Sequence, residues 1–384
     1  MEQSSGGSNP LFRTIDFHPD TTRWFNDSAP DRLTGSAGNY KRHSMVPSSS
    51  NGPPPAEVMF RMITGYWVSQ IIGVAAKLGI AEHLHVGAKS ADELARLTNS
   101  DPSALFRVLR AAASVGVFDL GADGRFSLTP LGETLVSHAA GSMREMAIMQ
   151  TSNGHWLPWG RLEDAVRTGT PQAVTALGCE LFEHYAKSPE EAAAFTGAMG
   201  NFSALVASEV AAHVDTSGMT RAVDIGGAEG TLIAALLGRN PSLTGIVFDL
   251  PHVTAIATAK LDAQGLLRRC EVVAGDFFKS VPSADLYVLK QILHDWNDEQ
   301  ATTILRNCAQ SMTPRRRMAI VEMVIPDDGS PTLAQLMDVN MLAILPGRER
   351  TQAEYTALLN VAGLRFERLV PTHSPFQILE AARS

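Results

Sequence analysis

The chain has 384 residues, 45% of them hydrophobic, so it is long enough for two or three domains with substantial cores. Its formal net charge of −8 argues against nucleic acid as the main partner, because phosphate binding needs a basic surface. Three widely spaced cysteines match neither a metal site nor a disulfide framework, which indicates a reducing, cytoplasmic location. No apolar run approaches the ~20 residues of a membrane helix and no secretory signal is visible, so we expect no membrane partner.

Residues 1–54 are rich in Gly, Ser and Pro, a composition typical of a disordered or loosely docked extension. Met45 is an alternative native start within this extension. Docking onto the rest of the chain is an alternative because the extension also holds four aromatic residues, Phe12, Phe17, Trp24 and Phe25.

Residues 55–150 are predicted to form helices followed by a small hairpin, the order of a winged-helix domain. Residues 58–84 are apolar nearly all round, and two shorter helices with N-terminal caps follow at 90–97 and 101–118. DNA binding is disfavoured because residues 56–150 hold eight Lys or Arg against nine Asp or Glu. A helix that is apolar all round must be buried, so we expect this winged-helix-like domain to form a homodimer.

Residues 151–215 are predicted to be a helical linker, and strands alternate with helices in the remaining domain, residues 216–384. Strands are expected to end near Ile225, Phe248, Ala274, Leu289 and Ile325, with two more near the C-terminus. Such alternation is typical of an α/β fold, a Rossmann-like, seven-stranded, mostly parallel sheet with helices on both faces. The short turn between the last two strands predicts one antiparallel strand.

A glycine turn between two of these strands indicates a nucleotide-like ligand. The stretch 221–250 reads RAVDIGGAEGTLIAALLGRNPSLTGIVFDL, an apolar strand through Asp224, a glycine turn, a helix and a second strand ending in Asp249. The glycine spacing differs from G-x-G-x-x-G, and Glu229 would lie beside a pyrophosphate, so a dinucleotide is disfavoured. S-Adenosylmethionine has a ribose and a positive charge, and it would tolerate these acidic surroundings.

Further candidate residues follow the other strands. The segment GDFF presents Asp276 and Phe277 to an adenine ring. Lys290 and His294 are expected one helical turn apart, and Asp295, Asn297 and Asp298 are candidates to cap the next helix. Glu322 ends a later strand, and Glu349 and Arg350 precede a helix.

Together these motifs resemble the class I S-adenosylmethionine-dependent O-methyltransferases of the caffeate and hydroxyindole type, which have bacterial natural-product relatives. The resemblance covers about residues 56–384 and rests on the order of DIGGAEG, FDLPHV, GDFF, KQILHDWNDEQ, VEMVIPD and PGRERT. It implies a homodimer and methyl transfer from S-adenosylmethionine to a hydroxyl of a small aromatic or polyketide-like acceptor, without a metal.

The resemblance also implies a role for each matching residue. The catalytic residues would be His294 as general base, with Glu322 and Glu349 orienting it. The cofactor contacts would be Asp224, Gly226, Asp249, Leu250, Asp276, Phe277 and Lys290. The acceptor contacts would be Met149, Gln150, Phe195, Met199, Asp295, Asn340 and Met341. The sequence departs from the family pattern at two places. In the glycine turn, Ala228 replaces a commoner glycine, and the loop before Glu349 is about one residue shorter than in the plant enzymes.

Other functions are compatible with parts of the sequence. A protein of this fold can bind the cofactor yet catalyse hydroxylation or a pericyclic reaction, or methylate nitrogen. Retention of His294, Glu322 and Glu349 favours O-methylation. A winged-helix regulator is disfavoured by the acidic N-terminal domain, and a nicotinamide dehydrogenase by the glycine spacing.

Overall fold

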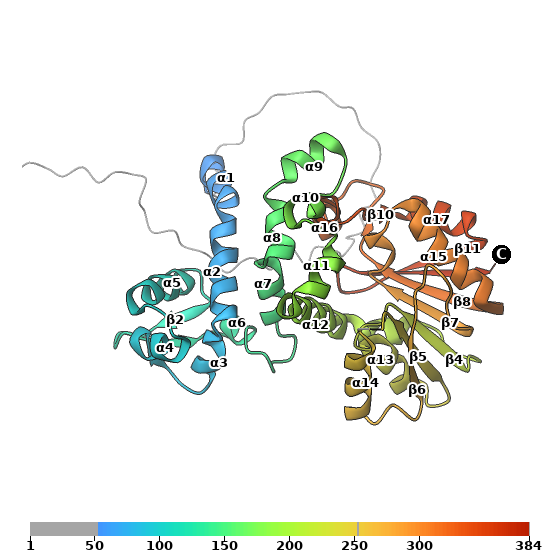
Figure 1. The fold of residues 1–384 in the computed structure, drawn as a ribbon, viewed down its shortest axis with the longest axis horizontal. Coiled ribbons are helices and arrows are strands. Elements are labelled where there is room, and N and C mark those ends of the chain that lie inside the picture. Colours follow the sequence, from blue (N-terminus) through green and yellow to red (C-terminus); the bar gives the residue numbers. More distant parts are fainter. Residues whose placement is uncertain (1–52, 252, 384) are drawn as a thin grey trace, which may run out of the picture.

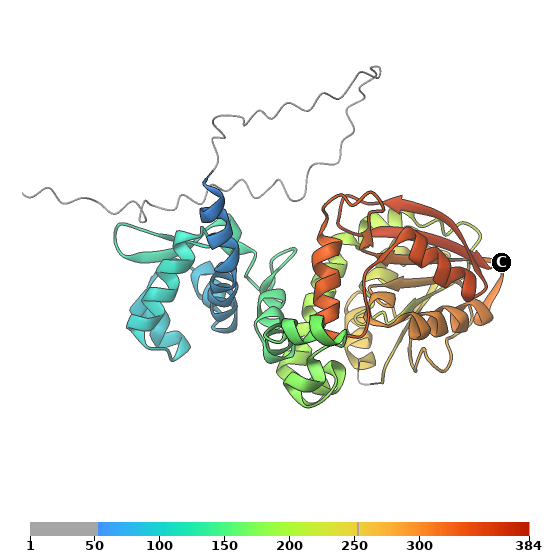
Figure 2. The ribbon, with the colours of Figure 1, turned by 90° about the horizontal axis from the view of Figure 1, so that it is seen from above.

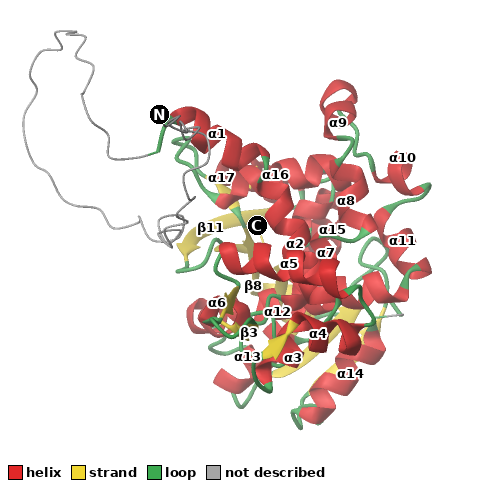
Figure 3. Ribbon diagram, turned by 90° about the vertical axis from the view of Figure 1, so that its left-hand side faces the viewer, coloured by secondary structure: helices red, strands yellow, loops and turns green. Residues whose placement is uncertain are grey.

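The computed structural model describes residues 53–251 and 253–383, apart from the side chains of residues 314 and 315. The expected extension 1–54, with its four aromatic residues, therefore lies almost wholly outside the described residues. The rest forms a helical N-terminal domain and a domain built on a sheet, with a group of helices between them (Figures 1 and 2). Figure 3 shows the side of the molecule on which the helical domain lies.

The N-terminal domain has the winged-helix order of helices and then a hairpin. Its helices are α1 (Pro55–Ile63), α2 (Gly65–Lys77), α3 (Ile80–His85), α4 (Ala91–Thr98), α5 (Pro102–Ser114) and α6 (Pro130–Glu133). Its three strands are β1 (Lys89–Ser90), β2 (Phe118–Leu120) and β3 (Arg125–Leu128), all antiparallel. The predicted caps are present: Ser90 forms a capping box with Glu93, and Asp101 accepts from the N–H of Ala104.

The apolar segment 58–84, which we expected to form a pair of helices, spans three helices. Thr64 interrupts it between α1 and α2, and Gly79 in a left-handed conformation separates α2 from α3. Large apolar side chains of α1 and α2 are exposed in the single chain, namely Met59, Phe60, Met62, Ile63, Tyr66 and Trp67. The segment Pro55–Lys77 is also long and apolar enough, by length and composition alone, to cross a membrane, so the expectation that no run reaches this length was wrong.

The linking region is helical, as expected. It comprises α7 (Arg144–Gln150), α8 (Asn153–Trp159), α9 (Leu162–Thr168), α10 (Ala173–Leu177), α11 (Leu181–Lys187) and the long α12 (Pro189–His213). Helix α12 packs against α7 on one side and α13 on the other, so it joins the two domains (Figure 1).

The central sheet has seven strands in the order β11-β12-β8-β7-β4-β5-β6. The strands are β4 (Arg221–Ile225), β5 (Thr244–Asp249), β6 (Cys270–Ala274), β7 (Ala284–Lys290), β8 (Met312–Glu322), β11 (Leu364–Pro371) and β12 (Gln377–Arg383). All pairings are parallel except those of β12, which is the expected antiparallel strand but lies inside the sheet, between β8 and β11. The chain adds β5 and β6 on one side of β4 and then β7 and β8 on the other. Ligands bind in such folds at the point where the strand order reverses, here between β4 and β7.

Helices cover both faces of this sheet, as predicted. The helices are α13 (Thr231–Arg239), α14 (Thr254–Ala263), α15 (Asp298–Ser311), α16 (Leu333–Ile344) and α17 (Gln352–Val361). One core packs α15 and α17 against the sheet through Ile304 and Leu359, and the other packs α12 and α13 through Val210 and Leu236.

Strand β8 ends at Glu322, three residues before the predicted end at Ile325. The next residues form the two-residue strand β9 (Val324–Ile325), which pairs in parallel with β10 (Arg350–Thr351). This small ladder brings the end of β8 beside the segment that carries Glu349.

Candidate active site

The candidate residues lie in a row at the carboxyl edge of the sheet. Asp276 follows β6, Asp249 ends β5, Gly226 follows β4, Lys290 ends β7 and Glu322 ends β8. These five strands are neighbours in the sheet, so residues far apart in the sequence come together along one edge. This is the ligand-binding edge of open α/β sheets.

The glycine turn is held by the carboxylate of Asp249. Its Oδ2 accepts from the N–H of Ala228 at 2.8 Å, and its Oδ1 accepts from the N–H of Leu250 at 2.7 Å. Gly226 has a φ of +64°, and a Cβ there would lie 2.4 Å from Cδ1 of Ile292. A side chain at Gly226 is therefore disfavoured by conformation, and it would also require Ile292 to move.

Two ionisable side chains lie at the middle of this edge, the buried Asp224 on β4 and the partly exposed Lys290 on β7. Burial raises the pKa of Asp224 to about 7, and its carboxylate accepts from the N–H of Ile233 at 3.3 Å. Burial lowers the pKa of Lys290 to about 8, against the opposing charges of Glu322 and Asp224. The Lys290 ammonium donates to Oε1 of Gln291 at 2.7 Å. The pKa values of both groups are therefore displaced toward neutrality.

Asp276 and Phe277 begin the turn after β6. The Asp276 carboxylate accepts from the N–H of Phe278 at 2.9 Å and lies 3.3 Å from Nζ of Lys279. The ring of Phe277 meets Trp296 edge-on at 6.0 Å between centroids. Both side chains are partly exposed, as contacts for an adenine ring would be.

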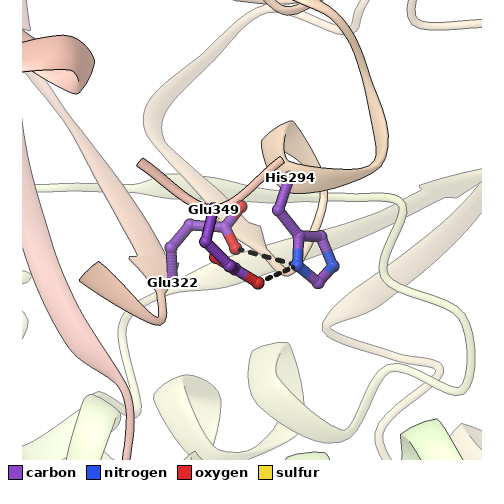
Figure 4. Close-up of side chains that lie close together, drawn as sticks. All are labelled: His294, Glu322 and Glu349. Atoms are coloured by element: carbon purple, nitrogen blue, oxygen red, sulfur yellow. Dashed lines mark hydrogen bonds and ion pairs between the residues drawn. The ribbon is translucent and has the colours of Figure 1, made fainter. Parts of the chain in front are cut away.

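His294 lies in a buried cluster of acidic side chains (Figure 4). It belongs to a short 3₁₀ turn, Leu293–Asp295, which follows the end of β7 at Lys290, so the expectation that Lys290 and His294 lie one helical turn apart was wrong. The imidazole Nδ1 lies 2.6 Å from Oε1 of Glu349 and 3.9 Å from Oε2 of Glu322. All three of His294, Glu322 and Glu349 are buried, with 5%, 0% and 2% exposure.

The two glutamates play different parts in the geometry. Oε1 of Glu322 accepts from the N–H groups of Ile292 and Leu293, at 3.1 and 2.9 Å, so it fixes the backbone just before His294. Glu349 contacts the imidazole directly. Burial raises the pKa of Glu322 to about 7 and that of Glu349 to about 8.

Asp295 lies on the other side of the ring, with Oδ1 3.3 Å from Nε2 of His294. We expected it to contact the acceptor, whereas here it contacts the imidazole. Burial raises the pKa of Asp295 to about 7. Of the residues expected to cap α15, Asn297 is the cap, since it accepts from the N–H of Gln300.

A metal ion is a second possible use of these side chains. Within the described residues, His294, Glu322 and Glu349 bring ligand atoms within 4.8 Å of one another. One oxygen each of Glu322 and Glu349 is buried without a hydrogen-bond partner in the described structure. That no metal takes part therefore stays a prediction.

Residues predicted to contact the acceptor gather in two adjoining apolar clusters. Met149 packs with Phe195 and Met199, and Met341 packs in a cluster that shares Phe195. Asn340 accepts from the indole N–H of Trp159 at 2.8 Å, and the amide of Gln150 lies 3.9 Å from the sulfur of Met146. Met149 and Met341 are buried here, whereas the other four are partly exposed.

Sequence reasoning missed two residues near His294. Trp296 stacks on Phe182 of α11 at 6.3 Å and meets Phe278 edge-on at 4.7 Å, so it connects the turn after β6 with the linking helices. Arg350, noted only as preceding a helix, is fully buried. Arg350 lies between Glu349 and the helix cap Thr351, and no local sequence pattern predicts that an arginine at such a position is buried.

Comparisons with known proteins agree with this geometry. A family model for the O-methyltransferase domain matches residues 159–365, and one for the O-methyltransferase dimerisation domain matches residues 60–138. The chain is 39% identical over 329 residues to phenazine O-methyltransferase of Lysobacter antibioticus, which covers 85% of this chain and 96% of that relative. It is 33% identical over 318 residues to 8-amino-8-demethylriboflavin N,N-dimethyltransferase of Streptomyces davaonensis, which covers 82% and 91% respectively.

The structure of human N-acetylserotonin methyltransferase in complex with S-adenosylmethionine is also similar, with a TM-score of 0.80 and 26% identity, over 88% of this chain and 99% of that one. The sheet order and the helical N-terminal domain are thus those of an S-adenosylmethionine-dependent methyltransferase. The chain belongs to the O-methyltransferase family and is an O-methyltransferase with a dimerisation domain.

Proposed function

We propose that this enzyme transfers the methyl group of S-adenosylmethionine to a hydroxyl of a small aromatic or polyketide-like acceptor, with His294 as general base. The observation that carries the proposal is the 2.6 Å contact between Nδ1 of His294 and Glu349. When Glu349 is ionised, its carboxylate would hold the proton on Nδ1, and Nε2 would then have the free electron pair that can accept a proton.

The cofactor fits the carboxyl edge of the sheet. Asp249 would accept from the ribose hydroxyls, Asp276 and Phe277 would contact the adenine, and Gly226 leaves room for close approach. The remaining proposed cofactor contacts are Leu250, Asp224 and Lys290. When bound, S-adenosylmethionine supplies a methyl group that its sulfonium charge already activates. The chain's own residues then need to align the acceptor and remove one proton.

A phenolic hydroxyl has a pKa near 10 and is mostly neutral at pH 7, so a base is useful. Nε2 of His294 would take the hydroxyl proton, and Glu349 in its ionised form would stabilise the imidazolium through Nδ1. Asp295 now lies near Nε2, so the acceptor hydroxyl would share that space with it. The acceptor itself would contact the cluster of Met149, Phe195, Met199 and Met341, together with Gln150 and Asn340.

An aromatic acceptor is supported by relatives whose names specify a phenazine and a riboflavin derivative. The second of these methylates nitrogen, so N-methylation is the alternative that a specific observation favours. A non-methylating reaction on this scaffold is a weaker alternative, because His294, Glu322 and Glu349 lie close together, as proposed for proton removal (Figure 4). We further propose that the enzyme is a cytoplasmic homodimer that uses no metal.

The test is product analysis with paired aromatic acceptors that differ only in a hydroxyl or an amino group. Incubation with S-adenosylmethionine should add one methyl group to oxygen, detected by mass spectrometry and NMR. His294→Gln should abolish most of this product while leaving cofactor binding intact. Methylation of the amines alone, or of neither set, would contradict the proposal.

A further inference from the structure

Arg350 is a charged side chain with no exposed surface. Burying a cation is costly unless hydrogen bonds and an opposite charge surround it. Here its guanidinium satisfies that requirement with five contacts to the chain. Nε and Nη2 donate to Oδ1 of Asp298 at 3.0 and 2.9 Å, while Nη1 donates to the carbonyls of Leu293 and Arg348 and Nη2 to that of Trp296.

Two of these contacts enclose the base. The carbonyl of Leu293 lies 2.9 Å from Nη1 and that of Trp296 lies 2.8 Å from Nη2, so one planar group holds the residues on both sides of His294 and Asp295. The position of Arg350 is set in turn by its parallel pairing with Val324, two residues after Glu322. Its preceding residue is Glu349, the partner of the imidazole.

We propose that Arg350 is a positioning residue that holds the 293–296 turn and thereby aims Nε2 of His294 at the acceptor hydroxyl. This inference rests on the proposed function of His294. The fork geometry of a guanidinium matters, because a single ammonium cannot bond both carbonyls and Asp298 in one plane. A small misplacement of a catalytic group costs up to about 100-fold in rate.

Arg348 provides a matched control. It also pairs with Asp298, at 2.8 Å, and with Glu354, at 3.4 Å, but its side chain is 46% exposed. Within the described residues, its side chain makes no hydrogen bond or ion pair with the 293–296 turn. Arg348→Gln thus removes the same kind of charge from the same carboxylate without releasing the carbonyls.

The experiment compares Arg350→Lys, Arg348→Gln and His294→Gln with the wild type, by kcat, by calorimetric Kd for S-adenosylmethionine and by Tm. With a phenolic acceptor, Arg350→Lys should lower kcat at pH 7 by about 10- to 100-fold with little change in Kd. The loss should shrink at high pH, as for His294→Gln, because the acceptor then ionises without a base. Arg348→Gln should remain close to wild type.

Several results would overturn the inference. Unchanged kcat in Arg350→Lys would do so, as would a loss that is equal at every pH and follows the folded fraction. If Arg350→Lys fails to fold, Asp298→Asn provides the test, because it removes the carboxylate that holds the Arg350 guanidinium against the two carbonyls. Asp298→Asn should lower kcat less than Arg350→Lys does, with the same pH trend. An unchanged kcat would contradict the positioning role of Arg350. Full activity of His294→Gln would instead refute the proposed function itself.

Discussion

At the scale of single residues, the site is defined by three carboxyl groups that are largely withdrawn from water around His294. Glu322 and Glu349 lie on the Nδ1 side of His294, and Asp295 lies on the Nε2 side. Burial disfavours the charged form of each carboxyl and raises its pKa to about 7, 8 and 7 respectively. The protein therefore keeps protons at neutral pH that an unfolded chain would release.

This predicts a stability that falls as pH rises. Unfolded Glu and Asp titrate near pH 4, so between about pH 5 and pH 8 the folded state binds more protons and the free energy of unfolding decreases. Lys290, with its pKa lowered to about 8, acts in the opposite direction only above that window. Glu322→Gln removes one buried titratable carboxyl. The free energy of unfolding of this variant should therefore decrease less between pH 5 and pH 8 than that of the wild type, with a difference on the order of 3 kcal/mol.

Urea unfolding of the unliganded protein at pH 5 and pH 8 measures this difference. Glu163→Gln is the control, since the Glu163 carboxylate is 77% exposed beside Arg167. Equal pH slopes in Glu322→Gln and Glu163→Gln would contradict the burial argument.

The roles of single residues were predictable only where a motif marked them. His294, Glu322 and Glu349 follow strand ends or precede a helix in recognisable segments, and the structure brings them together. Arg350 and Trp296 were missed because their contacts depend on the β9–β10 ladder and on α11, which no local pattern specifies. The role of each residue stays a prediction.

At the scale of elements, the strands after Arg221 and the capped helices α4 and α5 were predictable because strand alternation and capping residues are local. The strand-to-3₁₀ change after Lys290 was not predictable, because it depends on tertiary packing: the Glu322 carboxylate holds the backbone before His294. The positive φ of Gln291 (51°) was likewise not predictable, because a non-glycine residue in this conformation has no local sequence signal.

The glycine turn supplies an element-scale prediction. Ala228 has a φ of 45°, a conformation that costs Ala about 1 kcal/mol and Gly almost nothing. Ala228→Gly keeps the N–H that donates to Asp249, so it should stabilise the protein by about 0.5–1 kcal/mol in chemical denaturation.

Ala263 is the control, because it is an exposed alanine in the helical conformation, at the end of helix α14. Ala263→Gly should destabilise by about 0.5–1 kcal/mol. Destabilisation by both substitutions would mean that the turn stores no strain at Ala228.

At the scale of the whole molecule, the exposed apolar face of α1 and α2 requires a partner. The O-methyltransferase dimerisation model includes most of this segment, and the segment carries Glu57, Arg61 and Lys77, which a membrane core would not favour. A second copy of the chain therefore fits the face better than a bilayer does.

Ile63→Asp tests this assembly, because Ile63 is 65% exposed in the single chain. Light scattering at micromolar concentration should give a dimer for the wild type and a larger monomer fraction for the variant, since an interface core does not tolerate a charge. Leu97→Asp, 53% exposed on α4, is the control and should stay dimeric. A monomeric wild type would refute the dimer.

The most direct test of the account is the pH dependence of kcat for the wild type and for His294→Gln with a phenolic acceptor. We expect a loss of about 10²–10⁴-fold at pH 7, unchanged affinity for S-adenosylmethionine, and a smaller loss as the phenol ionises near pH 10. Full activity of His294→Gln at pH 7 would show that proximity alone drives the transfer and that His294 is not the base.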